Sequence, residues 1–327
     1  MAVIDVHTHM LTEEYLAFLG EHGGPKYERK PTEAGQDSIW MHGAPFMTLM
    51  PEMLDYDARI QDMDKAGVDL AIVSLTCPNA YFGDQAISVR AASMVNDSMS
   101  AQQTARPDRI AWFASLPWQY ADAARAELER AIANGAVGVM VIANIDGMNL
   151  THPDFAAVWQ AIDDLQLPVL VHPTAPPGTA DMGLDEYGLV PPIGFMVDTT
   201  LAIARMILDG FFDRYPNLKV IASHGGATLP YLAGRLDRCH EMIPACSDTI
   251  SEKPSTYLER IWYDAVVYSP SALELCLSVG GSDKVLFGSD YPHNIGDMAG
   301  CLSRVNGLPP DVAAKVRDGN ALRIFNL

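Results

Sequence analysis

Basic residues and cysteines are scarce in this 327-residue chain, and the sequence signals of several protein classes are missing. Only 22 Lys and Arg stand against 41 Asp and Glu, and the resulting net charge of −19 argues against nucleic acid or an anionic membrane as a partner. The five cysteines form no C-x-x-C pair, and no apolar run approaches the ~20 residues of a membrane span. We therefore expect a cytoplasmic protein with reduced thiols.

What the chain does have is a regular alternation of two patterns. Short apolar runs rich in Val, Ile and Leu are typical of strands that are buried on both faces. They occupy residues 3–9, 70–75, 110–116, 137–143, 168–173, 219–224, 261–267 and 284–290. Segments with apolar residues three or four apart lie between them and predict helices. These segments are residues 56–66, 84–105, 121–134, 153–165, 198–215, 228–240 and 271–279.

Eight strands that alternate with helices favour a (β/α)8 barrel, with residues 1–327 as one domain. The alternative is a doubly wound open sheet, but no G-x-G-x-x-G motif follows the first strand. Three long connections, residues 10–55, 174–197 and 240–259, interrupt the alternation. The first two leave from C-terminal strand ends, where barrel active sites lie, so we expect them to cover a pocket.

Five potential ligands lie at the ends of these predicted strands. His7 and His9 are two residues apart in a strand and therefore point to the same side. His172, His224 and Asp290 end the fifth, sixth and eighth runs. A closed barrel brings these ends to one mouth, so the sequence predicts a metal site there. Any one of these histidines alone would more often be a core residue, and the prediction depends on all five coinciding.

These residues and the strings around them resemble the amidohydrolase superfamily over essentially the whole chain. The signature strings are HTH, VHP, SHGG and GSDYP. The strings RIQDMDKAGVD, FFDRYPNLKV and SHGGATLPYLAGRLD are similar to the branch of non-oxidative decarboxylases that includes α-amino-β-carboxymuconate-ε-semialdehyde decarboxylase. The fourth strand ends in VIANI, without the lysine of two-metal relatives, so the resemblance implies one metal ion.

The resemblance also implies a role for each ligand residue. His7, His9, His172 and Asp290 would bind the metal, and His224 would stay off it and hydrogen-bond a metal-bound water. Neutral imidazoles with one carboxylate suit Zn²⁺, which we expect, with Mn²⁺ as the alternative and no organic cofactor. A metal ion lowers the pKa of its bound water toward about 7, and a nearby histidine can move the proton.

Arg235, in the string YLAGRLD, is the next candidate. In the branch that the chain resembles, the arginine at this place enters the neighbouring subunit's pocket and binds a substrate carboxylate, which implies a homodimer. A guanidinium group suits this role because it can meet both carboxylate oxygens. The alternative is an ordinary surface ion pair with Asp237 or another neighbour.

The chain departs from that branch at three pocket positions. Met47 stands where a second substrate arginine is expected, His293 replaces an aromatic residue, and Pro191 replaces a tryptophan. We therefore expect a substrate with one acidic group fewer. Phe46, Met47 and the methionines around them suggest an apolar, aromatic guest, or else residues that only pack the loop onto the barrel.

The leading hypothesis is a metal-dependent decarboxylase of a carboxylated aromatic or muconate-semialdehyde-type substrate, acting in aromatic compound catabolism. His224 and Asp290 would be catalytic and manage the proton that replaces CO₂, while Arg235, His293, Met47 and Phe46 would bind substrate. The second hypothesis is a metal-dependent hydrolase that opens a lactone or cleaves a C–C bond of a ring-cleavage product. A binding protein without turnover is the third.

Overall fold

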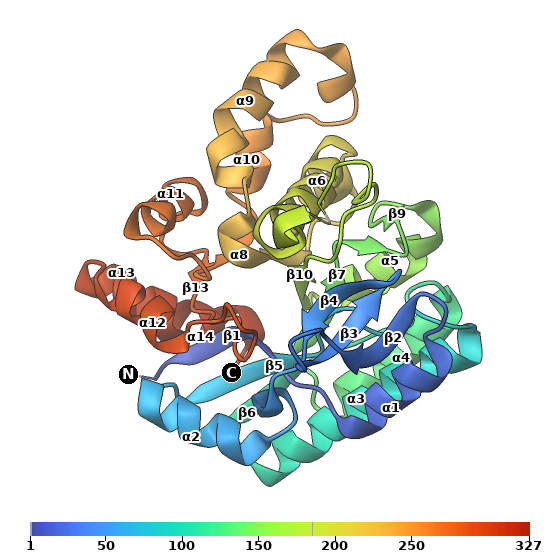
Figure 1. Cartoon of the computed structure of the whole chain (residues 1–327). Coiled ribbons are helices and arrows are strands. Elements are labelled where there is room, and N and C mark those ends of the chain that lie inside the picture. Colours follow the sequence, from blue (N-terminus) through green and yellow to red (C-terminus); the bar gives the residue numbers. More distant parts are fainter. Residues whose placement is uncertain (1, 185) are drawn as a thin grey trace.

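The computed structural model describes residues 2–184 and 186–327. Eight parallel strands form its main sheet, and helices cover the outside (Figure 1). In order around the sheet they are β1 (Ile4–His9), β5 (Leu70–Ser74), β6 (Ile110–Ala114), β7 (Gly138–Ile142), β10 (Pro168–His172), β11 (Lys219–Ala222), β12 (Trp262–Asp264) and β13 (Val285–Leu286).

The chain after β13 closes this sheet into a barrel by running beside β1. The backbone N–H of Val6 donates to the carbonyl oxygen of Phe287 at 3.0 Å, and the N–H of Asp290 donates to that of His7 at 2.8 Å. Gly288 allows the approach, because a Cβ there would lie 2.9 Å from the Cβ of His7. The predicted (β/α)8 barrel is confirmed, and the open-sheet alternative is wrong.

The outer helices follow the predicted ranges closely. They are α2 (Tyr56–Ala66), α3 (Gln85–Ala105), α4 (Ala121–Ala133), α5 (Ala156–Asp164), α6 (Phe195–Leu208), α9 (Leu229–Met242) and α11 (Pro270–Gly280). The sequence sets both ends of α2. Asp55 accepts the N–H groups of Asp57 and Ala58 as the N-cap, and Gly67 ends the helix with φ 80°.

The sixth and eighth predicted strands are shorter than expected. β11 stops at Ala222, so His224 lies in the tight turn α8 (Ser223–Gly226) with φ 54°. Asp290 lies four residues beyond β13, with φ 58°. The apolar runs continue through these turns because the turns themselves are buried, so hydrophobicity alone cannot mark the strand ends.

The predicted pocket-covering connections have structure of their own. Residues 10–55 hold α1 (Glu13–His22), the antiparallel strands β2 (Tyr27–Pro31), β3 (Asp37–Met41) and β4 (Ala44–Thr48), and η1 (Pro51–Met53). Residues 174–197 hold η3 (Glu186–Gly188) and η4 (Val190–Gly194), and residue 185 lies outside the described part of the chain.

Several short elements complete the chain. The helices after the eighth strand were not predicted as ranges, although they supply the last helical layer of the barrel. They are α12 (Met298–Asn306), α13 (Pro310–Ala314), η6 (Lys315–Gly319) and α14 (Asn320–Phe325). The remaining elements are β8 (Asn144–Ile145), β9 (Met148–Asn149), η2 (Pro153–Phe155), α7 (Phe211–Arg214), η5 (Pro244–Cys246) and α10 (Pro254–Leu258).

One helical stretch, Val190–Leu208, is long enough to cross a membrane and has a mean hydropathy of 1.3. This modifies the expectation that no apolar segment approaches that length. The stretch comprises η4 and α6, and the α6 side chains of Ile203, Met206 and Ile207 are buried in the hydrophobic core. Packing against the barrel therefore accounts for its apolar face.

Candidate metal centre

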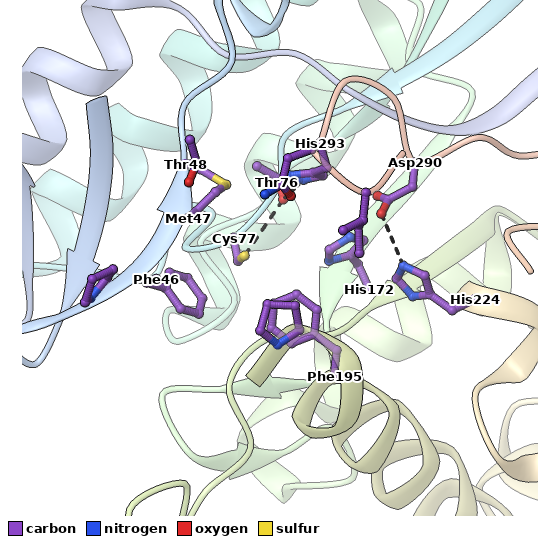
Figure 2. A pocket seen from close by; sticks show the side chains of 14 residues that line it. Phe46, Met47, Thr48, Thr76, Cys77, His172, Phe195, His224, Asp290 and His293 are labelled. Atoms are coloured by element: carbon purple, nitrogen blue, oxygen red, sulfur yellow. Dashed lines mark hydrogen bonds and ion pairs between the residues drawn. The ribbon is translucent and has the colours of Figure 1, made fainter. Parts of the chain in front are cut away.

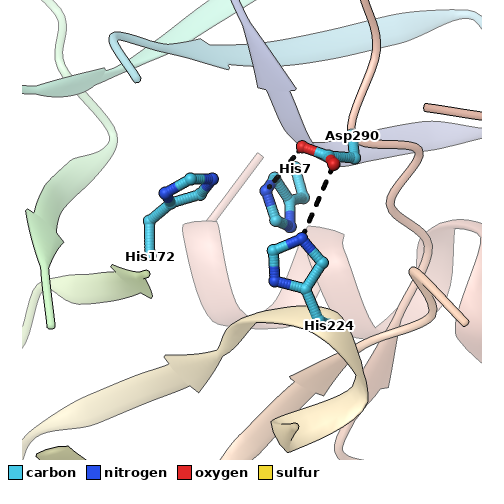
Figure 3. Close-up of side chains that lie close together, drawn as sticks. All are labelled: His7, His172, His224 and Asp290. Atoms are coloured by element: carbon cyan, nitrogen blue, oxygen red, sulfur yellow. Dashed lines mark ion pairs between the residues drawn. The ribbon is translucent and has the colours of Figure 1, made fainter. Parts of the chain in front are cut away.

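The five predicted ligands meet at the C-terminal end of the barrel, and all five are buried. Figure 3 shows His7, His172, His224 and Asp290 turned toward one another. One ligand atom from each of these four lies within 4.8 Å of the others. His9 joins from the same strand as His7, and their ring centroids are 5.0 Å apart. The structure thus brings together side chains that are separated by up to 283 residues.

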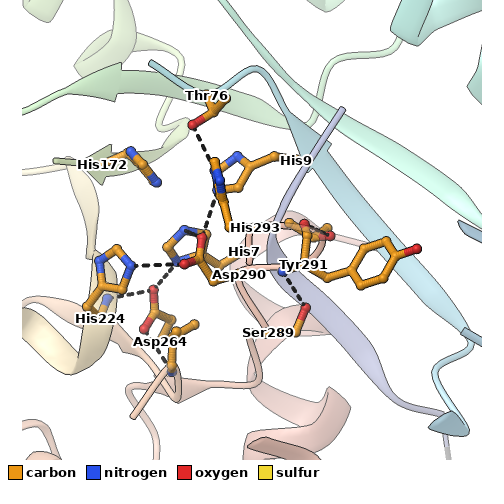
Figure 4. Close-up of polar contacts among 12 residues, drawn as sticks. His7, His9, Thr76, His172, His224, Asp264, Ser289, Asp290, Tyr291 and His293 are labelled. Carbon is orange, nitrogen blue, oxygen red and sulfur yellow. Dashed lines mark hydrogen bonds and ion pairs between the residues drawn. The ribbon is translucent and has the colours of Figure 1, made fainter. Parts of the chain in front are cut away.

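The Nδ1 atoms of the three histidines expected as ligands all have partners, and Figure 4 shows that of His7, which is Asp264. His7 Nδ1 lies 2.6 Å from Oδ2 of Asp264, and His9 Nδ1 lies 3.1 Å from Oγ of Ser74. His172 Nδ1 donates to the carbonyl oxygen of the next residue at 2.8 Å. Partners at Nδ1 fix the orientation of each ring and direct Nε2 toward the centre of the mouth.

The ligand atoms that face the centre of the barrel mouth, in contrast, lack partners among the described residues. Nε2 of His7, His9 and His172 and Oδ1 of Asp290 are buried and have no hydrogen-bond partner within the part of the chain that the structure describes. Asp290 Oδ1 lies 3.4 Å from Nε2 of His7 and 3.2 Å from Nε2 of His9. When a metal ion lies about 2.0–2.2 Å from each of its ligand atoms, two of those ligand atoms are separated by a distance of this size. The donor set therefore fits a divalent cation. Without one, each unpaired atom costs ~1–3 kcal/mol.

The electrostatics of the site also favour a cation. Burial lowers the pKa of His9 to about 3, and burial with the neighbouring imidazoles lowers the pKa of His172 far below its ordinary value. Burial alone would raise the pKa of Asp290, but the neighbouring rings of His293, His224 and His9 hold this pKa well below its usual range. Neutral imidazoles beside an ionised carboxylate are the protonation states that bind metal.

His224 differs from the other histidines. Its Nε2 lies 3.6 Å from Oδ2 of Asp290, the carboxylate oxygen that does not face His7 and His9. Its side chain also reaches a cavity of about 150 Å³ beside the cluster (Figure 2). His224 is therefore placed between Asp290 and the space in which a small molecule would lie.

This cavity is narrow and mostly apolar. Its lining comprises Pro45, Phe46, Met47, Thr48, Thr76, Cys77, His172, Pro191, Phe195, His224, Asp290, His293, Asn294 and Ile295, with no Lys or Arg among these described residues. The rings of Phe46 and Phe195 meet edge to face, with centroids 6.4 Å apart. Burial raises the pKa of Cys77 to about 12, so its sulfur stays a thiol.

The other sequence candidates divide into two groups. Phe46 and Met47 on β4, Pro191 and His293 all line the cavity. Arg235 does not, because it is exposed on α9. Within the described residues it forms no ion pair with Asp237, whose Oδ1 instead accepts the backbone N–H of Ser255 at 2.9 Å.

Asp264, Thr76 and Phe195 are among the site residues that the sequence analysis missed. Asp264 ends β12 but lies in the middle of the seventh apolar run, IWYDAVV, and an acidic residue inside an apolar run is the signal that could have identified it. Thr76 binds His293, with its Oγ1 3.1 Å from Nε2 of that residue. Phe195 faces Phe46 across the cavity mouth. A threonine or phenylalanine within an apolar segment gives no such signal.

Comparison with known proteins now gives the family. The model of the amidohydrolase family matches residues 4–327, and the chain belongs to this family. The 2-amino-3-carboxymuconate-6-semialdehyde decarboxylase of Dictyostelium discoideum is 28% identical over 340 residues, which cover 99% of this chain and 91% of the relative. The predicted resemblance is confirmed.

Solved structures agree with this assignment. The 5-carboxyvanillate decarboxylase of Sphingomonas paucimobilis superposes with a TM-score of 0.87 at 27% identity, covering 100% of this chain and 99% of the other. A dihydroxybenzoic acid decarboxylase from Polaromonas sp., solved with manganese and an inhibitor, has a TM-score of 0.82 over 100% and 97% of the two chains. Its 24% identity supports the fold alone. The relatives named here are decarboxylases, which supports the predicted activity.

Proposed function

We propose that this protein is a metal-dependent, non-oxidative decarboxylase of an aromatic carboxylate or of a muconate-semialdehyde-type ring-cleavage product. The observation that carries the proposal is the set of unpaired Nε2 and Oδ1 atoms beside a narrow apolar cavity. The relatives named above act on substrates of these classes, as their names state. Decarboxylation needs a site that stabilises charge, excludes water and delivers one proton to carbon.

We assign the metal to His7, His9, His172 and Asp290, whose unpaired atoms face one another. The ion supplies a positive charge that binds the substrate's oxygen atoms and stabilises the charge that develops as the C–C bond breaks. Three imidazoles and one carboxylate suit zinc, and manganese is the alternative. His224 remains off the metal in this assignment, because it faces Oδ2 of Asp290 rather than Oδ1.

His224 and Asp290 are the proposed catalytic residues. In the balanced reaction the carboxylate carbon leaves as CO₂, and the electron pair of the broken bond takes up one proton at the same ring carbon. A proton held between His224 Nε2 and Asp290 Oδ2, 3.6 Å apart, lies at the cavity wall where that carbon would be placed. Solvent then restores the proton through the histidine.

The cavity lining suggests what else the substrate carries. Phe46, Phe195 and Met47 offer contacts to an aromatic ring, and His293 with Thr76 offers polar contacts to a ring hydroxyl. Because the lining contains no cationic side chain, the site favours a substrate whose one carboxylate meets the metal. Arg235 would add a second anchor only from a partner subunit.

Release of CO₂ tests this proposal. The purified protein, loaded with Zn²⁺ or Mn²⁺, is assayed with dihydroxybenzoate and 5-carboxyvanillate, and with His224→Ala as the variant. We expect CO₂ from wild type and a loss of about 10²–10⁴-fold in the variant at unchanged metal content, because a general acid contributes that much. His22→Ala, on α1, is the control. Solvent ¹⁸O in the product without CO₂ would identify a hydrolase instead.

We further propose a cytoplasmic homodimer with one domain over residues 1–327. All five cysteines are free, which suits a reducing compartment. Arg235 is exposed on α9, which projects from the barrel in Figure 1, and this exposure supports the proposed contact with a second copy. Mixing His172→Ala with Arg235→Ala should restore part of the activity if sites are shared, since hybrids regain one intact site. No recovery in hybrids would refute the sharing of Arg235.

A further inference from the structure

Asp264, the last residue of β12, is a fully buried carboxylate for which the described residues provide no Lys or Arg within ion-pair distance. Four hydrogen bonds satisfy it instead. Oδ2 accepts from Nδ1 of His7 at 2.6 Å and from the backbone N–H of His224 at 3.0 Å. Oδ1 accepts the backbone N–H groups of Gly225 and Val266, both at 3.0 Å. One side chain thus contacts both halves of the site, which are the proposed metal ligand His7 and the backbone of the proposed catalytic residue His224 (Figure 4).

The contact with His7 determines which ring nitrogen carries the proton. An ionised carboxylate only accepts hydrogen bonds, so His7 Nδ1 must donate to Asp264. Nε2, the atom that faces Asp290 Oδ1 at 3.4 Å, is then the ring nitrogen left for a metal ion. His9 and His172 have neutral oxygens at Nδ1, so Asp264 is the charged partner among the three.

The contacts with the backbone hold an unusual turn. His224, Gly225, Gly226 and Ala227 have consecutive φ values of 54°, 63°, 75° and 54°. L-residues with side chains are strained in this left-handed region. The carboxylate of Asp264 accepts the first two N–H groups of this run, and successive N–H groups of this kind form a concave site for an anion. The turn directs the His224 ring toward Asp290.

We propose that Asp264 is a positioning residue that couples the two halves of the site. Its carboxylate holds His7 in the tautomer that binds metal and, through the turn at residues 224–227, holds His224 at the substrate cavity. This inference rests on the proposed function for its role in turnover. The tautomer and the turn are properties of the chain itself and can be measured without substrate.

The first experiment concerns His7 in the metal-free wild-type protein. Long-range ¹H–¹⁵N correlation spectra distinguish a proton on Nδ1 from one on Nε2. We expect His7 to carry a proton on Nδ1, and a ring that is protonated on Nε2 alone overturns the proposal. Since this measurement needs no variant, it holds even if substitutions at position 264 prevent folding. The measurement also remains valid if no substrate is turned over. Failure of this inference can therefore be distinguished from failure of the proposed decarboxylase activity.

The second experiment compares Asp264→Asn with Asp163→Asn, a matched control. Asp163 is also buried and accepts a backbone N–H, from Asn217 at 2.7 Å, but lies outside the cavity lining. Calorimetric titration with Zn²⁺ alone should give an affinity 10–100-fold weaker for Asp264→Asn. Amide hydrogen exchange at His224 and Gly225 should accelerate in that variant only. Affinity within twofold of wild type together with unchanged exchange overturns the proposal.

Discussion

Metal binding should stabilise this protein by an amount that depends on His172. The buried polar atoms without partners in the described residues include Nε2 of His7, His9 and His172 and Oδ1 of Asp290, and a divalent ion would satisfy these four. At a free metal concentration 100 times Kd, binding to the folded state adds ~2.7 kcal/mol to the free energy of unfolding. With an unfolding entropy of about 2.1 cal/mol/K per residue over 327 residues, this raises Tm by ~4 °C.

The His172→Ala variant should lose this effect. If removal of one of four donors weakens binding 100-fold, the same metal concentration equals Kd, and the stabilisation falls to ~0.4 kcal/mol, or ~0.6 °C. Scanning calorimetry of chelator-treated protein, with and without Zn²⁺ or Mn²⁺, measures both shifts. His22→Ala, a half-buried histidine at the end of α1, should keep the full shift. Equal shifts for wild type and His172→Ala would refute the assigned ligand set.

Two further predictions concern stability. Arg59→Met should lower the free energy of unfolding, measured in urea, by ~3 kcal/mol. The reason is that the buried guanidinium group donates to Thr8 Oγ1 at 2.6 Å and to the His9 carbonyl oxygen at 2.5 Å. A loss below ~1 kcal/mol would contradict this prediction. Burial raises the pKa of Asp198 from 3.8 to about 6, so the folded protein keeps a proton that the unfolded chain has released between pH 4 and 6. The free energy of unfolding of the wild type should therefore fall by up to ~3 kcal/mol, relative to that of Asp198→Asn, as pH rises through this window. A difference between the two proteins that does not change with pH would contradict the prediction.

The barrel and the meeting of the five candidate ligands could be predicted because each apolar run marks a buried strand and each candidate lies at or near the end of such a run. The range predicted for α2, residues 56–66, matches the helix because Asp55 and Gly67 act as its caps. His7, His9 and His172 lie on strands as predicted. These signals are local, so a single sequence carries them.

Other parts of the site depend on packing that no local pattern encodes. The turn at His224 exists because Asp264, 40 residues later, accepts its backbone N–H groups. The small sheet β2–β3–β4 places Phe46 and Met47 at the cavity, although its strands have little alternation of buried and exposed residues. The proposed role of Arg235 depends on a second chain, so neither the sequence nor the structure of one subunit can establish it.

The central claim is that three imidazoles and one carboxylate bind a single divalent ion at the mouth of the barrel. Anomalous diffraction from crystals grown with Mn²⁺ or Zn²⁺, measured on both sides of the metal's absorption edge, tests it directly. The account predicts one strong peak per chain, within about 2.3 Å of Nε2 of His7, His9 and His172 and of Oδ1 of Asp290. A peak elsewhere, or none at these atoms, would contradict it.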